Sequence, residues 1–173
     1  DVTLPETCKK IGQSAFEKCG LLESVNFDNV SIISDYAFYR CSSLSCAKLG
    51  GANLSRVYAV GDYAFAGGYV KDGEEETLVD GARFDSLTLT NLSRIGVGSF
   101  AYCSKLESVV LGKKTRISES MFEATPIKEI VIYSDIISDY AFAGCTELES
   151  VVFKKDLTYL GEEAFSGCSA LDE

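Results

Sequence analysis

The cysteines are the residues of this sequence that invite chemistry first. Seven cysteines are present and no histidine. The common serine and cysteine mechanisms need an imidazole as base, and a zinc site made of cysteine alone needs thiols gathered in one local motif. The closest pair, Cys41 and Cys46, is predicted to point to opposite sides of the chain. We therefore predict no catalytic residue, no metal and no cofactor.

The spacing of the cysteines favours a structural role. Five of them recur at one position of a repeat, namely Cys19, Cys41, Cys103, Cys145 and Cys168. The equivalent residues on either side of Cys103 are Gly68 and Thr125, so Cys103 has no disulfide partner there. A position that accepts an unpaired cysteine suits a small apolar side chain. We expect these five thiols to be buried and reduced, and Cys46, which should face outward, to be the most reactive.

A glycine-rich stretch, Gly96-Val97-Gly98-Ser99-Phe100-Ala101, matches the G-x-G-x-x-A pattern of dinucleotide-binding loops. Such a match needs a dinucleotide-binding unit around it. Here Gly96 recurs at the same repeat position as Gly61 and Gly161, and Phe100 belongs to a column of repeated phenylalanines. We therefore interpret this stretch as structural.

Residues 68–83 interrupt the repeats with an acidic insertion. Glu74, Glu75 and Glu76 lie in it, and Asp72-Gly73 stands between two short β-prone segments, which predicts a hairpin. The spacing of an EF-hand is absent. Three readings remain open: a solvated hairpin, a binding loop, or the site of an enzyme, although no nucleophile and base occur together there.

These residues must be positioned by a repeat of about 22 residues, which indicates a solenoid. The clearest copy reads Ile11-x-x-x-Ala15-Phe16-x-x-Cys19-x-x-Leu22-x-x-Val25-x-Phe27, and about seven copies follow one another. One position is phenylalanine in every copy: Phe16, Phe38, Phe65, Phe100, Phe122, Phe142 and Phe165. Because this column is invariant along the chain, we predict that its rings share one core layer, with Phe100 buried between Phe65 and Phe122.

Each copy combines a strand with a short turn. The L-x-x-V-x-F part matches the strand signature of leucine-rich repeats, with Ala47 and Leu49 as strand residues in the second copy. The preceding Ser-Asp pairs, such as Ser34-Asp35, resemble helix N-caps. We predict an α/β solenoid, a right-handed leucine-rich-repeat superhelix with one parallel β-sheet and short helical turns on the opposite side. We expect residues 1–173 to form a single array.

The outward face of that sheet is the candidate binding surface. Stacked strands would place one residue per copy in a central outward column, and acidic residues beside it. The candidates are Lys48, Thr88, Val110, Val131 and Val152 in the column, Glu107 and Glu149 beside it, and Glu74, Glu75 and Glu76 in the insertion. An apolar strip with an acidic edge suits a protein with a basic rim. The alternative is that β-branched residues simply favour strands.

Composition excludes several classes of partner. The formal net charge of −10 disfavours nucleic acids, whose binding depends on neutralised phosphates. No run of eighteen apolar residues occurs, so we expect no direct membrane insertion. Both ends cut through the repeat pattern without a polar capping unit, and we expect the array to be a piece of a longer protein.

The I-x-x-x-A-F-x-x-C-x-x-L-x-x-V-x-L frame resembles the BspA-like, or Treponema pallidum-type, class of leucine-rich repeats over nearly the whole chain. This resemblance implies a secreted or cell-surface protein that binds a host or matrix protein, or a glycan, without catalysis. Two alternatives are a structural spacer that only displays other domains, and an enzyme with a site in the 68–83 insertion. The oligomeric state is left open.

Overall fold

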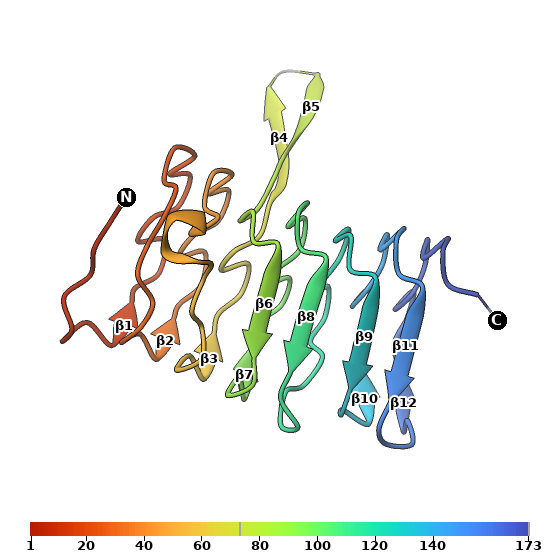
Figure 1. The fold of residues 1–173 in the computed structure, drawn as a ribbon. Helices are drawn as coiled ribbons and strands as arrows, with labels where there is room; N and C mark the ends of the chain where they lie inside the picture. The colour runs from red at the N-terminus through yellow and green to blue at the C-terminus, as the bar shows by residue number, and fades with distance from the viewer. Residues whose placement is uncertain (73, 173) are drawn as a thin grey trace.

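The computed structural model describes residues 1–72 and 74–172, and these form a solenoid. We call each complete winding of the chain a coil. Four long strands stack in parallel in the order β11-β9-β8-β6, as Figure 1 shows. They are β6 (Ser86–Leu89), β8 (Ser108–Leu111), β9 (Glu129–Ile132) and β11 (Ser150–Phe153). The predicted solenoid with a parallel sheet is therefore confirmed.

Short strands form a second set of parallel ladders that the sequence analysis did not predict. Four stack in the order β1-β2-β3-β7, and β10 pairs with β12. They are β1 (Lys10–Ile11), β2 (Ile32–Ile33), β3 (Ala59–Val60), β7 (Arg94–Ile95), β10 (Ile136–Ile137) and β12 (Tyr159–Leu160). In the coils that contain both a long and a short strand, the chain therefore pairs with its neighbours on two sides, because the apolar residue that opens the repeat also lies in a strand.

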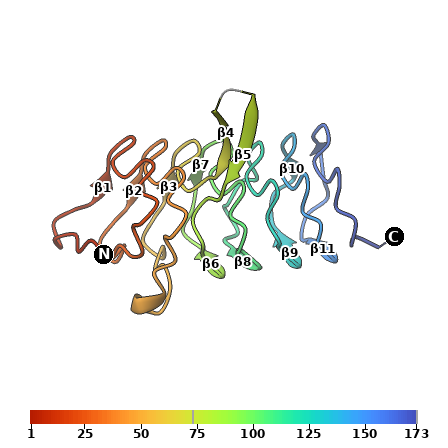
Figure 2. The same cartoon turned by 90° about the horizontal axis from the view of Figure 1, so that it is seen from above.

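The first copies depart from the predicted sheet. Val25 makes only an isolated bridge to Val2, and residues Ala47–Leu49 form the 3-10 helix η1 instead of a strand. Cys46 before η1 has a φ of 54° and Gly50 after it has a φ of 78°. These two left-handed residues turn the chain out of the strand direction, and η1 protrudes from the solenoid (Figure 2).

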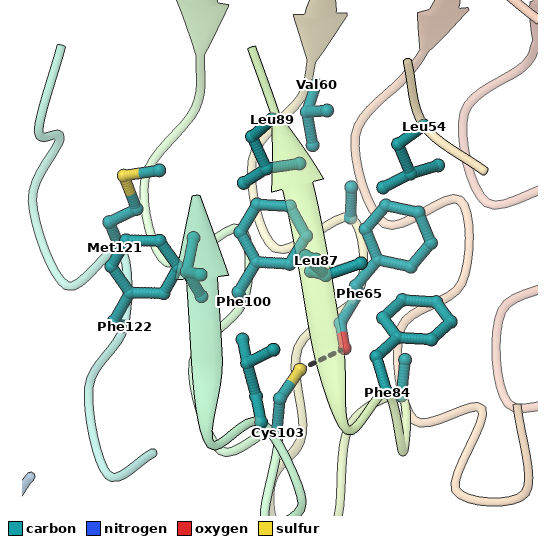
Figure 3. Packing of buried hydrophobic residues seen from close by; sticks show 14 of the residues in the cluster. Leu54, Val60, Phe65, Phe84, Leu87, Leu89, Phe100, Cys103, Met121 and Phe122 are labelled. Atoms are coloured by element: carbon teal, nitrogen blue, oxygen red, sulfur yellow. Dashed lines mark hydrogen bonds between the residues drawn. The ribbon is translucent and has the colours of Figure 1, made fainter. Parts of the chain in front are cut away.

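The phenylalanine column forms the centre of the core. Phe38, Phe65, Phe100, Phe122 and Phe142 are buried, and Phe16 and Phe165 are partly buried. The ring of Phe100 stacks on Phe65 at 5.5 Å and on Phe122 at 5.8 Å between centroids (Figure 3). Stacked aromatic rings at this distance add to the apolar burial. The predicted core layer and the place of Phe100 in it are confirmed.

The predicted short helical turns are wrong, since these segments form successive tight turns. In the second copy Tyr36 and Arg40 have φ values of 56° and 58°. This left-handed geometry directs the N–H groups of Tyr36, Phe38 and Arg40 along the stack, where they donate to carbonyls of the next coil. The donor–acceptor distances are 2.8 Å for Tyr36 to Asp62, 2.7 Å for Phe38 to Ala64 and 2.8 Å for Arg40 to Ala66.

The intervening N–H groups close local turns. The N–H of Tyr39 donates to the carbonyl of Tyr36 at 3.1 Å, and that of Cys41 to Phe38 at 3.1 Å. An α-helix would direct all its N–H groups along its own axis and leave the coils unjoined. Hydrogen bonds between coils therefore replace the helical ones, and the same alternation recurs along the array.

The residue that opens each turn depends on the coil before it. Where the preceding coil has Asp at the next position, the following coil has Gly: Asp35 precedes Gly61, Asp62 precedes Gly96 and Asp139 precedes Gly161. The Asp62 carboxylate accepts the N–H of Val97 at 2.9 Å. A Cβ at Gly96 would lie 2.3 Å from Asp62 Oδ1 and from its backbone nitrogen. Gly96 is therefore required by close packing.

Where the preceding coil has a residue other than Asp at that position, the following coil opens with serine. After Gln13, Val97 and Glu119, the following coils open with Ser34, Ser118 and Ser138. The Ser118 hydroxyl donates to the carbonyl of Gly96 at 2.8 Å, and the Ser138 hydroxyl to Ile117 at 2.9 Å. Gly96 of the G-x-G-x-x-A match is thus explained by the contact between coils, which agrees with the structural interpretation.

The insertion forms the predicted hairpin. Strand β4 (Gly68–Asp72) pairs antiparallel with β5 (Glu75–Val79), and Gly73 of the expected turn lies outside the described residues. The hairpin leaves the solenoid at Gly67 and Gly81, where a Cβ on Gly81 would lie 2.6 Å from the Gly67 nitrogen. It rises from the edge where the long strands begin (Figure 1), and Figure 2 shows it on the side opposite η1. None of the described residues belongs to a helix with the length and apolarity that crossing a membrane requires.

Candidate protein-binding surface

The outward residues of the four long strands form one exposed surface, which we call the sheet face: Thr88, Val110, Val131 and Val152. Thr88 lies beside Val110 in the β6–β8 pair, and Val131 beside Val152 in the β9–β11 pair. The exposed fractions are 53% for Val110, 39% for Val131 and 43% for Val152. Alternation explains this, since Leu87, Val109 and Ile130 on the other side of the sheet are buried. The structure thus brings four of the predicted site residues together.

The acidic row beside the sheet face contains a lysine that the sequence analysis overlooked. Glu107 and Glu149 are exposed and precede β8 and β11, and Lys128 holds the same position before β9. The Lys128 ammonium lies 2.8 Å from the Glu107 carboxylate and 3.9 Å from that of Glu147. The hydrogen bond from Lys128 lowers the pKa of Glu107, and in return Glu107 raises the pKa of Lys128. Lys128 therefore neutralises part of the negative charge of the acidic row.

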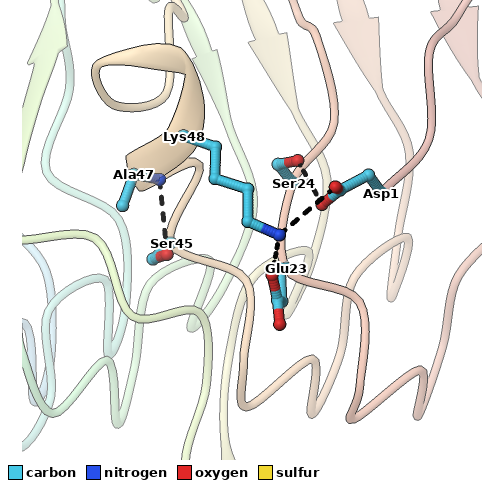
Figure 4. Close-up of polar contacts among 6 residues, drawn as sticks. All are labelled: Asp1, Glu23, Ser24, Ser45, Ala47 and Lys48. Atoms are coloured by element: carbon cyan, nitrogen blue, oxygen red, sulfur yellow. Dashed lines mark hydrogen bonds and ion pairs between the residues drawn. The ribbon is translucent and has the colours of Figure 1, made fainter.

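Lys48 does not lie in the column where it was predicted. It belongs to η1, and its ammonium lies 2.5 Å from the Glu23 carboxylate and 3.4 Å from that of Asp1 (Figure 4). The hydrogen bond from Lys48 lowers the pKa of Glu23. The strand assignment was wrong because Cys46 takes a left-handed conformation, so Lys48 is removed from the sheet face.

The predicted residues of the insertion stand apart from the sheet face. Glu74, Glu75 and Glu76 are exposed on the hairpin, which projects away from the solenoid. The base of the hairpin is held by Arg40, whose guanidinium donates to the carbonyl of Tyr69, and by Tyr69, whose ring meets Tyr102 edge-on at 5.9 Å. Arg40 also lies over the Tyr39 ring at 4.7 Å. These contacts fix the base, so the acidic strands project from a defined point.

The prediction for the thiols was right for Cys41, Cys103 and Cys145 and wrong for Cys19, Cys168 and Cys46. Cys41, Cys103 and Cys145 are buried, but Cys19 is exposed and Cys168 is half-buried, because these two belong to the outermost coils described. Cys46 is buried, and its thiol lies 3.5 Å from the carbonyl oxygen of Val25. Its left-handed backbone turns the side chain inward, whereas a strand would have pointed it outward.

We expect a thiol reagent to label Cys19 first in the native protein. Burial raises the pKa of Cys41 to about 12 and also raises the pKa of Cys46, so neither offers an accessible thiolate near neutral pH. Mass spectrometry of tryptic peptides after brief maleimide treatment measures the order. Cys41, Cys46 and Cys103 should react only in denaturant, and labelling of Cys46 before Cys19 would contradict the burial described above.

Within residues 1–72 and 74–172, no three His, Cys, Asp or Glu side chains gather into a group that could hold a metal ion. The surface offers apolar contact, carboxylates and one lysine. Such an arrangement can bind a partner by shape and charge.

Comparisons with known proteins place these features in context. A family model described as BspA type leucine rich repeat region, in six copies, matches residues 1–72 and 75–173. No curated protein matches. A leucine-rich repeat protein from Bacteroides ovatus ATCC 8483 has a similar fold, with a TM-score of 0.50 and 20% identity over 98% of this chain and 64% of its own. A leucine rich cell surface protein from Faecalibacterium prausnitzii A2-165 gives a TM-score of 0.46 and 21% identity over 98% of this chain and 57% of its own. The chain therefore spans less than two thirds of the length of either structure.

Proposed function

Because the chain belongs to the family of BspA-type leucine-rich repeat proteins, we propose that it is a non-catalytic scaffold that binds a protein through the sheet face. The exposed strip of Val110, Val131 and Val152 carries this proposal. β-Branched residues are common in strands because of their intrinsic β-propensity. Three exposed valines side by side nevertheless form an apolar patch whose contact with water is unfavourable, and such patches mark interaction sites. The proposal extends to an extracellular or cell-surface location, as the family resemblance implies, and to adhesion to a host or matrix protein.

The chemistry of the strip favours a protein as occupant. Protein interfaces combine a desolvated apolar centre with a polar rim, and the sheet face offers the valines as the centre and Glu107, Glu129 and Glu149 as part of the rim. Each long strand is hydrogen-bonded to at least one neighbour, so binding orders little additional backbone. The excess of carboxylates over the single Lys128 suits a partner with basic residues around an apolar patch.

In this proposal the acidic hairpin attracts the partner electrostatically at long range. Since Glu74, Glu75 and Glu76 stand away from the sheet face, they act on the approach of a basic partner more than on the final contacts. Replacing all three by glutamine should slow association and weaken its dependence on salt, while dissociation changes little. Surface plasmon resonance separates these two rates.

Val131→Glu is expected to weaken binding by at least about tenfold, because it places a charge at the desolvated centre of the contact. The measurement is the dissociation constant for partners selected from a panel of purified extracellular matrix proteins. Leu21→Glu is the matched control, since Leu21 is 93% exposed and lies outside the long strands. Equal binding by wild type and Val131→Glu would exclude the sheet face, and absence of any preference across the panel would favour the spacer alternative.

A further inference from the structure

Basic residues gather at the edge of the solenoid where the long strands end, although the whole chain carries a net charge of −10. The segments that leave β6, β8, β9 and β11 are residues 90–94, 112–116, 133–135 and 154–158. They contain six basic side chains and two acidic ones, Asp135 and Asp156. We call the six basic residues the basic edge: Arg94, Lys113, Lys114, Arg116, Lys154 and Lys155. The acidic hairpin rises from the opposite edge of the coils (Figure 1).

The six side chains of the basic edge are exposed, and no hydrogen bond or ion pair joins them to the other described residues. The salt bridges of the described part of the chain instead involve Lys18, Lys48 and Lys128. Arg94 lies on the coil next to that of Lys113, Lys114 and Arg116, about 4.8 Å away in a parallel stack, so these cations repel one another. Lys154 and Lys155 lie two coils beyond, with Asp135 on the coil between. A bound anion would relieve that repulsion.

Two hollows open on this edge. One, of about 670 Å³, is lined by Arg94 and Arg116 together with Ser93, Ser118, Ser134, Ile136 and Ser138, and Asp135 is the one acidic residue of its lining. The other, of about 570 Å³, is lined by Lys113 and Lys114 together with Thr90, Asn91 and Tyr133, and it also includes Ser93. Because both include Ser93, they adjoin, and an extended ligand can pass from one into the other.

The polar groups of the hollows can accept hydrogen bonds. The hydroxyls of Ser93, Ser118 and Ser134 donate to backbone carbonyls at 3.3, 2.8 and 2.7 Å. Their protons are thus used. The Ser134 oxygen also accepts the N–H of Ile136 at 3.2 Å, so the lone pairs of Ser93 and Ser118 are the ones that can accept from a ligand rich in hydroxyls. The exposed side chain of Ile136 and the half-buried ring of Tyr133 add apolar surface against which a sugar ring can lie.

From this combination we infer that the basic edge binds an anionic polysaccharide, a chain that carries carboxylates or sulfates as well as hydroxyls. This surface is distinct from the sheet face, so the inference stands apart from the proposed protein partner. A nucleic acid fits less well: duplex DNA carries one charge per about 1.7 Å, and single strands are held by stacking on several aromatic side chains. The hollows offer one aromatic residue, Tyr133, and a sparse row of cations.

The test compares two triple variants with the same change in net charge. Lys113→Glu with Lys114→Glu and Arg116→Glu removes the centre of the basic edge. Lys71→Glu with Arg83→Glu and Lys105→Glu is the control. These three residues are exposed and belong to the opposite edge, because Lys71 lies in β4 of the hairpin and Arg83 and Lys105 come three residues before β6 and β8 begin. The probes are polygalacturonate, dextran sulfate, neutral dextran, oligo-dT and phosphatidylserine vesicles. Circular dichroism confirms that each variant folds, and binding is measured at about 50 and 300 mM salt because screening grows between them.

We expect wild type to bind at least one of the two anionic polysaccharides at low salt, more weakly at high salt, and not to bind neutral dextran. The basic-edge variant should bind at least about tenfold more weakly, and the control variant should remain within about threefold of wild type. Equal losses in both variants, no binding to either anionic polysaccharide, or tighter binding to oligo-dT or vesicles would each overturn the inference. Val131→Glu should leave polysaccharide binding unchanged, which separates this result from failure of the proposed protein site.

Discussion

Replacing Phe100 by alanine is expected to lower the free energy of unfolding by about 3–5 kcal/mol. The Phe100 ring is fully buried and stacks between Phe65 and Phe122. Alanine would leave a cavity in the middle of a continuous aromatic column, where the coils on both sides are already close-packed and cannot collapse inward. Urea denaturation followed by circular dichroism measures the loss.

Phe165→Ala provides the matched control for this prediction. Phe165 holds the same repeat position but is only partly buried, and it stacks on one ring of the column, Phe142, at 5.2 Å. Phe165→Ala should therefore lower the free energy of unfolding clearly less than Phe100→Ala. The slope of the transition must also be compared, because a repeat array whose two halves separate unfolds less cooperatively. A loss below about 1 kcal/mol for Phe100→Ala would mean that the column is loosely packed.

Gly96→Ala is expected to destabilise the protein by about 1–3 kcal/mol, although it changes a half-buried residue by one methyl group. The new Cβ would meet the Asp62 carboxylate and backbone nitrogen of the preceding coil at 2.3 Å. Backbone atoms cannot move aside as the end of a flexible side chain can. The two coils must separate, and the hydrogen bond from Val97 to Asp62 is strained or lost.

Gly12→Ala tests whether the loss of stability expected for Gly96→Ala comes from the contact between coils or from replacing a glycine at this repeat position. Gly12 opens its coil at the same repeat position, but a Cβ there would meet nothing within 4 Å. It should therefore leave stability unchanged or raise it slightly, since alanine restricts the unfolded chain. Thermal denaturation of the two variants beside wild type measures the difference. Similar midpoints for Gly96→Ala and wild type would show that the coils adjust without cost.

The solenoid and its core could be predicted from sequence because their signals repeat. A single Phe or Leu says little, but a phenylalanine at one position of seven copies can only form a column. The alternation within Leu87-Thr88-Leu89 likewise fixes which side of the strand is buried, and the structure agrees. The same logic assembled Val110, Val131 and Val152 on one face.

The turns could not be predicted because their determinants lie in the next coil. Ser34-Asp35 has the local pattern of a helix N-cap, yet the Asp35 carboxylate accepts the N–H of Asp62 at 3.0 Å, a residue 27 positions later. The local sequence favours a helix N-cap and a tight turn equally, so it does not distinguish between them. Lys48 was misplaced for a related reason, since the left-handed turn at Cys46 overrides the strand pattern.

The surfaces were only partly visible in the sequence. The pairing of Lys128 with Glu107 follows from the repeat position that they share, and aligning the copies at that position would have revealed it. The basic edge is only partly regular, because Arg94 and Arg116 both precede the residue that opens their copies, whereas Lys114 and Lys155 hold different positions. Only the stacking of the coils brings these charges together.

The pairing of Asp with Gly between coils restricts how such an array can lengthen by duplication. Suppose that unequal recombination duplicated the coil that contains Gly96 and Val97. The glycine of the second copy would then stack on the valine of the first. Neither a hydrogen bond to an Asp carboxylate nor one from a serine hydroxyl would form between the two copies. A coil that opens with serine, placed after Asp62, would instead press its Cβ against that carboxylate. The opening residue of each coil must thus match the residue that it meets in the preceding coil. Gene rearrangements that preserve folding must keep these two residues as a compatible pair.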